Sequence, residues 1–290
     1  MRIEKKEGIV ALGFLAPNLF GFVLFTVGPI VASIYLSFND WNLMNTPKWT
    51  GFGNYLFLFG DSRFGQVVRN TVVFSIAMVP IGIVLALFFA LMLNIKIRGM
   101  MVFRTIFFIP VVATMTGVAM LWRWLLQDEI GLVGYLLSLV GLQSPYFLSS
   151  TKWSLFSVIM VSVWKRVGYD IVLLLAGLQG IDPTYYEVAR MDGASRLQQF
   201  KNITLPLLTP TLFFTLVMMT INSFQAFDQT YILTKGGPAY STTTIVYYIY
   251  LQAFESMRMG RACAAAVLLF IVIMIITLIQ WRAQKEWVNY

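Results

Sequence analysis

Long hydrophobic runs dominate this chain, and short polar segments separate them. A helix needs about 20 apolar residues to cross the hydrocarbon core of a bilayer. Six stretches are long enough, and each predicts a membrane-spanning helix: 13–35, 70–93, 105–126, 154–178, 207–227 and 262–280. The pattern therefore predicts an all-α polytopic membrane protein with six transmembrane helices.

Two of these predicted spans have interrupted patterns. The third contains Pro110 and Arg123, and the fourth has a polar centre. A further apolar run, Thr244–Phe254, is too short to span a bilayer and is rich in tyrosine. Because aromatic side chains favour the membrane–water boundary, we expect this run to form a partly inserted or interfacial helix.

Composition supports the bilayer as the solvent. The chain has 290 residues, of which 58% are hydrophobic and 12% are charged. Soluble domains are about 45–50% apolar and about 25% charged. We therefore expect residues 1–290 to form a single transmembrane domain. We expect no cleavable signal peptide, since the first apolar run is longer than the core of such a signal.

The residue types that the sequence lacks limit the chemistry of the chain. It has no histidine and one cysteine, Cys263, which excludes an internal disulfide, His-ligated zinc, and Ser-His or Cys-His nucleophile pairs. It also has no GxxxxGK[ST] phosphate-binding loop, so we expect no ATP hydrolysis by this chain. The sequence predicts no catalytic residues, no metal site and no cofactor bound by the chain itself.

Lysine and arginine positions predict the orientation, because positive charge accumulates on the cytoplasmic side. One side of the predicted spans carries eleven such residues: Arg2, Lys5, Lys6, Lys96, Arg98, Arg104, Arg190, Arg196, Lys201, Arg282 and Lys285. The other side carries five: Lys48, Arg63, Lys152, Lys235 and Arg258. Both termini are therefore expected in the cytoplasm. Cationic loops beside anionic lipid account for the net charge of +8.

The longest predicted cytoplasmic loop, residues 179–206, has the pattern of a helix–turn–helix. Asp182 and Pro183 favour a helix start, because aspartate caps helices and proline suits the first helical position. Asp192-Gly193 predicts a sharp turn, since glycine adopts left-handed backbone conformations. A second short helix follows, and we expect Leu205-Pro206 to end it and to begin the fifth span.

The spacing within this loop resembles the EAA coupling motif of binding-protein-dependent ABC importer permeases. Val188 stands where the family has its first alanine. The matching positions, with the Asp192 that precedes the turn glycine, are Glu187, Ala189, Asp192, Gly193, Ile203, Leu205 and Pro206. The segments "APNLFGFVLFTVGPIVASIYLSFNDWN", "SVWKRVGYDIVLLLAGLQGIDPTYYEVARMDG" and "LTKGGPAYSTTTIVYYIYLQAF" are similar to the carbohydrate and glycerol-3-phosphate permease subfamily.

The resemblance implies a type I importer transmembrane domain in a bacterial inner membrane. The partners that it implies are a second, non-identical permease, two cytoplasmic ABC ATPases carrying ATP and Mg²⁺, and an extracytoplasmic solute-binding protein. The two short helices would dock in a cleft of the ATPase, with Glu187 meeting a basic residue there. The outer loop around Gly236 would face the binding protein. The implied cargo is a sugar, an oligosaccharide, or a related polyol or glycerol phosphate.

Charged side chains within the fourth predicted span are costly in a bilayer and tend to be functional or paired. Arg166 and Asp170 are four residues apart on one helical face and could neutralise each other. The pair could fix helix packing or lie on the translocation path. Lys165 would reach a polar environment only if this helix is tilted, or broken at Gly168.

The fifth predicted span carries amides at Asn222, Gln225 and Gln229, with Phe224 and Phe227 beside them. The spacing predicts one polar stripe along a helix. Amides that bond hydroxyl groups, together with aromatic rings that cover apolar sugar faces, suit a neutral carbohydrate. The same residue types also form hydrogen bonds between membrane helices. Asp228 and Gln229 could equally cap the end of the helix.

Two other functions are weighed against an importer permease. An ion-coupled secondary transporter or channel would work without an ATPase, and such carriers usually need buried acidic groups; only Asp170 lies deep in a predicted span. A membrane-embedded enzyme would need a catalytic constellation, and none is visible. The sequence therefore favours an ATP-driven importer subunit.

Overall fold

A computed structural model describes residues 13–95 and 99–287, and most of them are helical. They form two compact units. The first combines residues 13–61 with Ile249–Phe270, and the second combines Ser62–Tyr248 with residues 271–287. The single transmembrane domain expected from the sequence stays a prediction.

Buried polar contacts hold the first unit together. A helix over Gly13–Ser37 contains the π-helical segment η1 (Val23–Val27) and α2 (Gly28–Ser37). A two-stranded antiparallel sheet follows, β1 (Asn39–Asp40) with β2 (Lys48–Trp49), and then α3 (Gly53–Gly60). The buried Asn54 amide donates to the carbonyl oxygens of Ser37 and Asn39, both at 2.9 Å. It therefore ties α3 to the end of α2.

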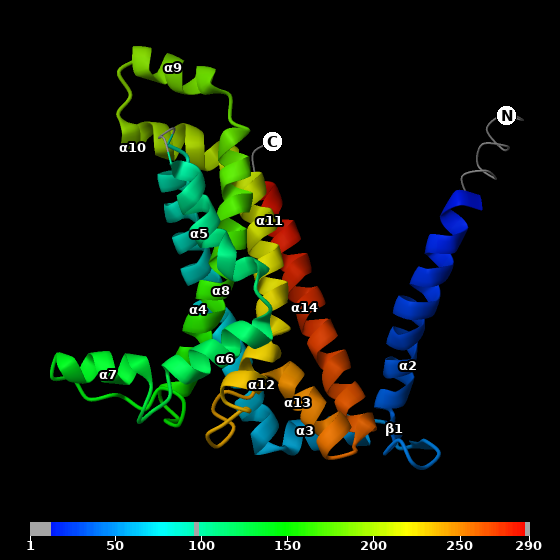
Figure 1. Cartoon of the computed structure of the whole chain (residues 1–290). Coiled ribbons are helices and arrows are strands. Elements are labelled where there is room, and N and C mark those ends of the chain that lie inside the picture. Colours follow the sequence, from blue (N-terminus) through cyan, green and yellow to red (C-terminus); the bar gives the residue numbers. More distant parts are fainter. Residues whose placement is uncertain (1–12, 96–98, 288–290) are drawn as a thin grey trace, which may run out of the picture. The chain divides into compact units, whose positions relative to one another are not determined.

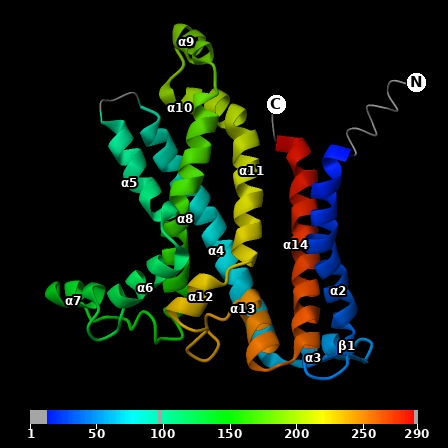
Figure 2. The same ribbon diagram turned by 45° about the vertical axis from the view of Figure 1, so that its right-hand side comes forward.

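The second unit contains the long helices and the polar loop. Its elements are α4 (Ser62–Leu93), α5 (Met100–Val112), α6 (Met115–Leu125), α7 (Leu132–Leu139), α8 (Ser154–Gln179), α9 (Pro183–Met191), α10 (Arg196–Gln199), η2 (Phe200–Thr204), α11 (Leu205–Phe224) and α12 (Asp228–Leu233). Three elements cross the boundary or lie in the first unit: α13 (Ile245–Tyr250), η3 (Leu251–Glu255) and α14 (Met259–Trp287). In both ribbon views α9 and α10 lie at one end of the second unit, and α6, α7 and α12 lie at the other (Figures 1 and 2).

Helix α8 is the centre of the second unit, because it packs against α4, α5 and α11. Small residues allow close approach between membrane helices. A Cβ atom on Gly168 would lie 2.0 Å from the carbonyl oxygen of Phe107 in α5. A Cβ atom on Gly177 would lie 2.5 Å from Oγ1 of Thr211 in α11. The first contact places the α8 backbone against the α5 backbone, and the second packs the α8 backbone against the Thr211 side chain of α11.

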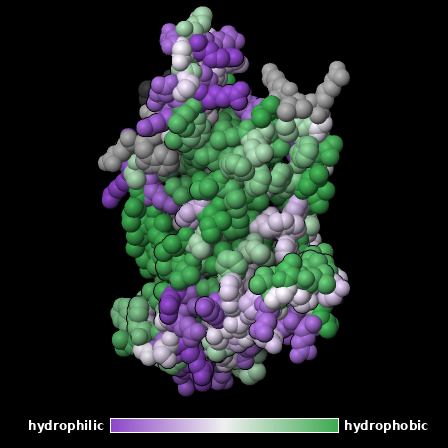
Figure 3. All heavy atoms as spheres, turned by 90° about the vertical axis from the view of Figure 1, so that its left-hand side faces the viewer, coloured by the Kyte–Doolittle hydropathy of each residue, from purple (hydrophilic) through white to green (hydrophobic). Residues whose placement is uncertain are grey.

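Within residues 13–95 and 99–287, four helices are long and apolar enough to cross a membrane by length and composition: Gly13–Ser37, Ser62–Leu93, Arg196–Phe224 and Met259–Lys285. The pair α5 and α6 passes the same test only if the two are taken together. Helix α8 has 26 residues, but every 18-residue stretch of it contains Lys165, Arg166 and Asp170. Figure 3 shows apolar side chains gathered in a band on one face, with polar side chains beyond it at the α9–α10 end and at the opposite end.

The third predicted span is wrong as a continuous helix. Helices α5 and α6 are bent by 98° at Ala113 and Thr114, whose ψ angles are both 145°. Pro110 lacks the N–H that would hold the last turn of α5. Thr114 then starts a new helix, since its side chain accepts a hydrogen bond from the backbone N–H of Gly117. The fourth helix, in contrast, runs through Gly168 without a break.

The predicted stop at Leu205-Pro206 is also wrong. The chain is helical from Arg196 to Phe224 without interruption. The π-helical segment η2 ends at Thr204, two residues before Pro206, and the N–H of Leu205 donates to the carbonyl of Phe200, five residues back. This wider turn accommodates the proline, which cannot donate its own hydrogen bond. The run Thr244–Phe254 is helical as expected, in α13 and η3, and its place at a membrane boundary stays a prediction.

Candidate functional site

The loop between α8 and α11 folds as the predicted helix–turn–helix. Asp182 caps α9, because its carboxylate accepts a hydrogen bond of 2.9 Å from the backbone N–H of Thr184. That hydrogen bond holds the pKa of the Asp182 carboxyl below its ordinary value. Pro183 occupies the start of the helix, where its missing N–H costs nothing.

The turn between the two short helices has a defined geometry. Gly193 has a φ of +77°, which glycine adopts without strain. The N–H groups of Gly193 and Ala194 donate to the carbonyls of Arg190 and Ala189, which is the Schellman arrangement at a helix end. Ser195 then caps α10 in a capping box with Gln198. Local hydrogen bonds therefore fix the shape of this loop.

Four large apolar side chains are exposed on the otherwise polar surface of α9 and α10. The side chains of Tyr185 and Val188 are 56% and 47% exposed, and those of Met191 and Leu197 are 81% and 75% exposed. Glu187, Asp192 and Gly193 are also exposed. Exposed apolar side chains grouped on a short projecting helix are typical of a protein–protein contact.

Other motif residues fasten the loop to the long helices. Ile203 and Leu205 are half-buried and pack against the core formed by α4, α8 and α11. The Tyr186 hydroxyl lies 2.9 Å from Oγ1 of Thr204, within hydrogen-bonding distance, which joins α9 to η2. Ala189 and Pro206 are half-buried. The predicted coupling residues therefore form two groups. Glu187, Asp192 and Gly193 are exposed, whereas Ala189, Ile203, Leu205 and Pro206 are half-buried.

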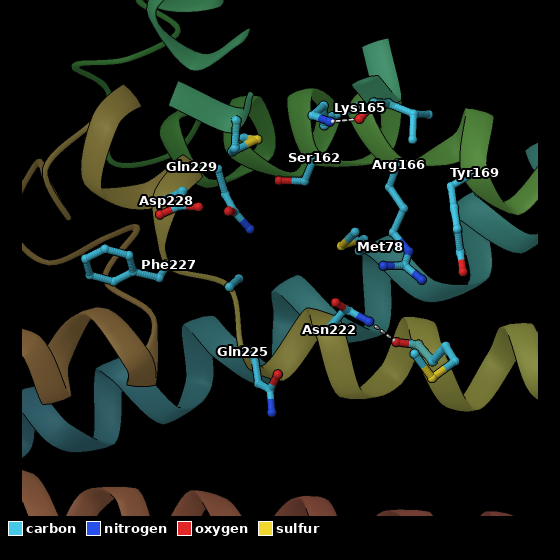
Figure 4. A pocket seen from close by; sticks show the side chains of 14 residues that line it. Met78, Ser162, Lys165, Arg166, Tyr169, Asn222, Gln225, Phe227, Asp228 and Gln229 are labelled. Carbon is cyan, nitrogen blue, oxygen red and sulfur yellow. Dashed lines mark hydrogen bonds between the residues drawn. The ribbon is translucent and has the colours of Figure 1, made fainter. Parts of the chain in front are cut away.

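A cavity of about 470 Å³ lies in the middle of the second unit. Its wall is formed by residues of α4, α5, α6, α8 and α11, by the segment that leads into α12 and by the first turn of α12. The polar lining residues are Ser162, Lys165, Arg166, Tyr169, Asn222, Gln225, Asp228 and Gln229. Figure 4 shows the α8 side chains on one wall and Asn222 on the facing wall, with Met78 between them. The cavity therefore presents both donors and acceptors.

Two of the three charged residues of α8 line the cavity, and the third does not. Lys165 lines the cavity, and its Nζ donates to the carbonyl of Val111 at 2.9 Å, beside the break between α5 and α6. Arg166 also lines the cavity and pairs with the fully buried Asp170, with 3.2 Å between Nε and Oδ2. The predicted pairing of Arg166 with Asp170 is confirmed. Asp170 itself lies outside the cavity wall, behind Arg166.

The three predicted amides line this cavity, but not as a stripe along one helix. Helix α11 ends at Phe224, Gln225 caps it, and Gln229 belongs to α12. The prediction of a single polar helix through Gln229 is therefore wrong, because the chain turns at residues 225–227. Phe224 is buried away from the cavity, and Phe227 lines it instead. Asp228 lies in the first turn of α12, and its side chain does not cap that helix.

Several lining residues had no signal in the sequence. Ser162 and Tyr169 are ordinary residues of an apolar run, and Met78 and Met218 match a core pattern. Only their spacing from Arg166 by three or four residues could have indicated Ser162 and Tyr169. The methionines come from α4 and α11, so only the packing of these helices brings them to the cavity.

The chain has clear relatives. A model of the family described as binding-protein-dependent transport system inner membrane component matches residues 78–285. The chain is 37% identical to the probable ABC transporter permease protein YesP of Bacillus subtilis (strain 168), over 100% of this chain and 94% of that one. It is 31% identical to the sulfoquinovosyl glycerol transport system permease protein SmoG of Agrobacterium fabrum, over 97% of this chain and 92% of that one.

A third relative is the sn-glycerol-3-phosphate transport system permease protein UgpA of Yersinia pestis bv. Antiqua, at 32% identity over 84% of this chain and 82% of that one. Among solved structures, a bacterial ABC transporter involved in the import of the acidic polysaccharide alginate matches with a TM-score of 0.86 and 28% identity, covering 99% of each chain. A bacterial alginate ABC transporter in complex with alginate pentasaccharide-bound periplasmic protein also matches with a TM-score of 0.86, at 26% identity, covering 99% of this chain and 97% of that one.

Proposed function

This chain belongs to the binding-protein-dependent transport system inner membrane component family and is a permease subunit of an ABC importer, and we propose that it forms half of a carbohydrate translocation path. The proposed cargo is a sugar, an oligosaccharide, or a related polyol or glycerol phosphate. Family membership favours this function over an ion-coupled carrier that works without an ATPase.

The observation that carries the proposal is the exposed apolar surface of α9 and α10. Four large apolar side chains, at Tyr185, Val188, Met191 and Leu197, point out of the described fold. A partner that covers them would bury apolar area and gain free energy. We propose that this partner is a cytoplasmic ABC ATPase, which carries ATP and Mg²⁺, and that Glu187 meets a basic residue in its cleft.

The structure of the loop suits the transfer of a displacement from α9 to α11. Its turn is closed by two backbone hydrogen bonds at Gly193, and its second helix continues through η2 into α11. A displacement of α9 would therefore move α11, whose far end carries Asn222 and Gln225 on the cavity wall. This connection would link nucleotide-driven closure of two ATPase subunits to the shape of the cavity.

The cavity supports a hydroxyl-rich cargo. Asn222, Gln225 and Gln229 offer amide donors and acceptors, and Phe227 offers an aromatic surface. Such a combination suits sugars. The relatives named for sulfoquinovosyl glycerol and sn-glycerol-3-phosphate transport, and the alginate importer structure, support the same class. Lys165, Arg166 and Asp170 are proposed to shape the path from the α8 side, Asp170 indirectly by holding Arg166.

The remaining partners follow from the same proposal. A second, non-identical permease would complete the path, and an extracytoplasmic solute-binding protein would deliver the cargo to the end of the unit that carries α6, α7 and α12. The alginate transporter solved with a periplasmic protein supports such a partner. The chain is an inner-membrane component, and we propose that both of its termini face the cytoplasm.

The test uses the complete transporter in proteoliposomes with its binding protein and cargo. Gly193→Asp places a side chain at a φ of +77°. Because this adds a negative charge to the turn beside the proposed ATPase contact, we expect cargo-stimulated ATP hydrolysis to fall at least about tenfold, which corresponds to about 1.4 kcal/mol of lost coupling. Gly193→Asn is the matched control, since asparagine has the same shape and the same tolerance of left-handed backbone but no charge, and it should retain most of the activity.

Co-purification completes this experiment. A tagged chain should retain a P-loop ATPase, and replacing both Val188 and Met191 with aspartate should release it. Transport that continues after every partner ATPase has been removed would contradict the proposed function. So would an undiminished stimulation of hydrolysis in the Gly193→Asp variant.

A further inference from the structure

A second, larger cavity lies beneath the two short helices. Its volume is about 1280 Å³, and it is bounded by α9 and α10 and by the adjoining ends of α4, α5 and α8. Three arginines from three helices line it: Arg104 of α5, Arg190 of α9 and Arg196 of α10. No aspartate or glutamate is among the described residues that line it. The cavity is therefore strongly positive.

The guanidinium groups retain donors for a ligand. Arg104 donates from one terminal nitrogen to the carbonyl of Leu93 at 3.0 Å, while its Nε is buried without a hydrogen-bond partner among the residues that the structure describes. Arg190 donates from Nε to the carbonyl of Tyr186 at 3.1 Å, which leaves its terminal nitrogens available. Each guanidinium has five N–H donors, and a buried unpaired donor is unfavourable. The group that would satisfy them is an anion with several acceptor oxygens.

The rest of the lining is apolar. Ile95, Met100, Met101, Leu178 and Ile181 face the same cavity. Met101 is 80% exposed and Ile95 is 54% exposed, so this apolar side is open to the surroundings of the helices. A cavity with arginines on one side and open apolar side chains on the other matches an amphiphile. A small soluble anion would leave the apolar side uncovered.

We propose that this cavity binds the phosphate headgroup of an anionic phospholipid from the leaflet at the α9–α10 end. The arginines would hold the phosphate oxygens, and the start of the acyl chains would cover Met100 and Met101. Basic pockets between helices on the cytoplasmic side suit such headgroups. The lipid would bridge α5 to α9 and α10, and so would brace the coupling loop against the long helices.

The test measures lipid retention by the purified full-length chain in detergent, using native mass spectrometry. Dioleoyl phosphatidylglycerol should bind more tightly than dioleoyl phosphatidylcholine. One arginine near an anionic headgroup contributes a factor of about fivefold, so Arg196→Gln, at an exposed position, should weaken retention by about that factor. The double variant Arg104→Gln/Arg190→Gln should weaken it about 30-fold.

Matched control variants distinguish a specific lipid site from a general attraction between positive charge and anionic lipid. Lys201→Gln removes an exposed positive charge from the neighbouring segment η2 without touching the cavity, and it should retain wild-type affinity. Arg104→Lys preserves the charge and should lose less affinity than Arg104→Gln. Arg196→Gln lies on the surface and should fold as the wild type does, so the site can be tested even if the double variant does not fold.

Three outcomes would overturn the proposal. The two lipids could bind equally, or Lys201→Gln could weaken binding as much as Arg196→Gln does. Alternatively, inorganic phosphate or glycerol phosphate could displace the lipid at equal concentration, which would make the cavity a site for a soluble phosphate. The measurement involves no ATP and no partner protein, so its failure would leave the proposed transport function untouched.

Discussion

At the scale of single residues, Asp182 determines where α9 begins. Its carboxylate accepts the backbone N–H of Thr184, and this hydrogen bond lowers the pKa of Asp182. A carboxyl whose pKa is lowered in the folded state stabilises that state above its unfolded pKa. The contribution is lost as the pH falls through the folded pKa. The first turn of α9 should therefore loosen in acid.

Hydrogen exchange of the Thr184 amide checks this expectation. The protection factor should be high at neutral pH and should fall as the pH drops below the ordinary range of an aspartate. Asp182→Ala should remove the protection at every pH, whereas Asp182→Ser keeps an acceptor oxygen and should preserve it without the pH dependence. Asp192→Ala, at the other end of α9, is the control and should leave Thr184 protected. Equal protection in the wild type and in Asp182→Ala would show that the cap contributes nothing.

Residue-level patterns predicted the polar loop well, because its signals are local. Asp182 and Gly193 act through neighbours within five residues, so their order in the sequence contains the geometry. The pair Arg166 and Asp170 was predictable for the same reason. Arg104, Arg190 and Arg196 meet only after α5 has packed beside the loop, so no local pattern could indicate the cavity they share.

At the scale of helices, the close contact between α5 and α8 depends on one glycine. A Cβ atom on Gly168 would lie 2.0 Å from the Phe107 carbonyl oxygen, and a backbone atom cannot move aside cheaply. Gly168→Ala should therefore lower the free energy of unfolding by about 1–3 kcal/mol. The thermal unfolding midpoint of the purified protein in detergent measures this effect.

Gly65 offers a matched control for that substitution. It lies within α4 with nothing within 4 Å of its Cβ position, so alanine meets no neighbour there. Because alanine favours helix over glycine by about 0.5–1 kcal/mol, Gly65→Ala should be neutral or slightly stabilising. A Gly168→Ala protein that unfolds at the wild-type temperature would show that α5 and α8 are further apart than described.

Two predicted helix boundaries, at Pro206 and at Phe227, were wrong for a common reason. The expected end at Pro206 ignored the π-helical turn η2, which lets the helix pass through the proline. The expected continuation to Phe227 ignored the end of α11 at Phe224. Apolar patterns show which residues avoid water, and they do not show where the backbone hydrogen bonds change register. The end of α11 at Phe224 also shapes the polar cavity, because the turn at Gln225 brings Gln229 back to the cavity wall.

At the scale of the whole molecule, the two polar ends of the second unit are expected on opposite sides of the membrane. Arginine and lysine are concentrated at the α9–α10 end, which predicts that this end is cytoplasmic. Gln143, in the loop after α7, and Ala283, near the end of α14, are both exposed. They are therefore suitable positions for single cysteines that report the two sides.

The background for this experiment is favourable, since Cys263 is the one cysteine of the chain and is buried, and Cys263→Ala removes it altogether. In that background, a membrane-impermeant maleimide added to intact cells should label Gln143→Cys. It should label Ala283→Cys only after the membrane is permeabilised, and neither substitution alters the net charge on which the orientation depends. Labelling of Ala283→Cys in intact cells would place the α14 terminus outside. The exposed surface of α9 and α10 would then have no access to a cytoplasmic ATPase, because Ala283 and the coupling loop are predicted to lie on the same side.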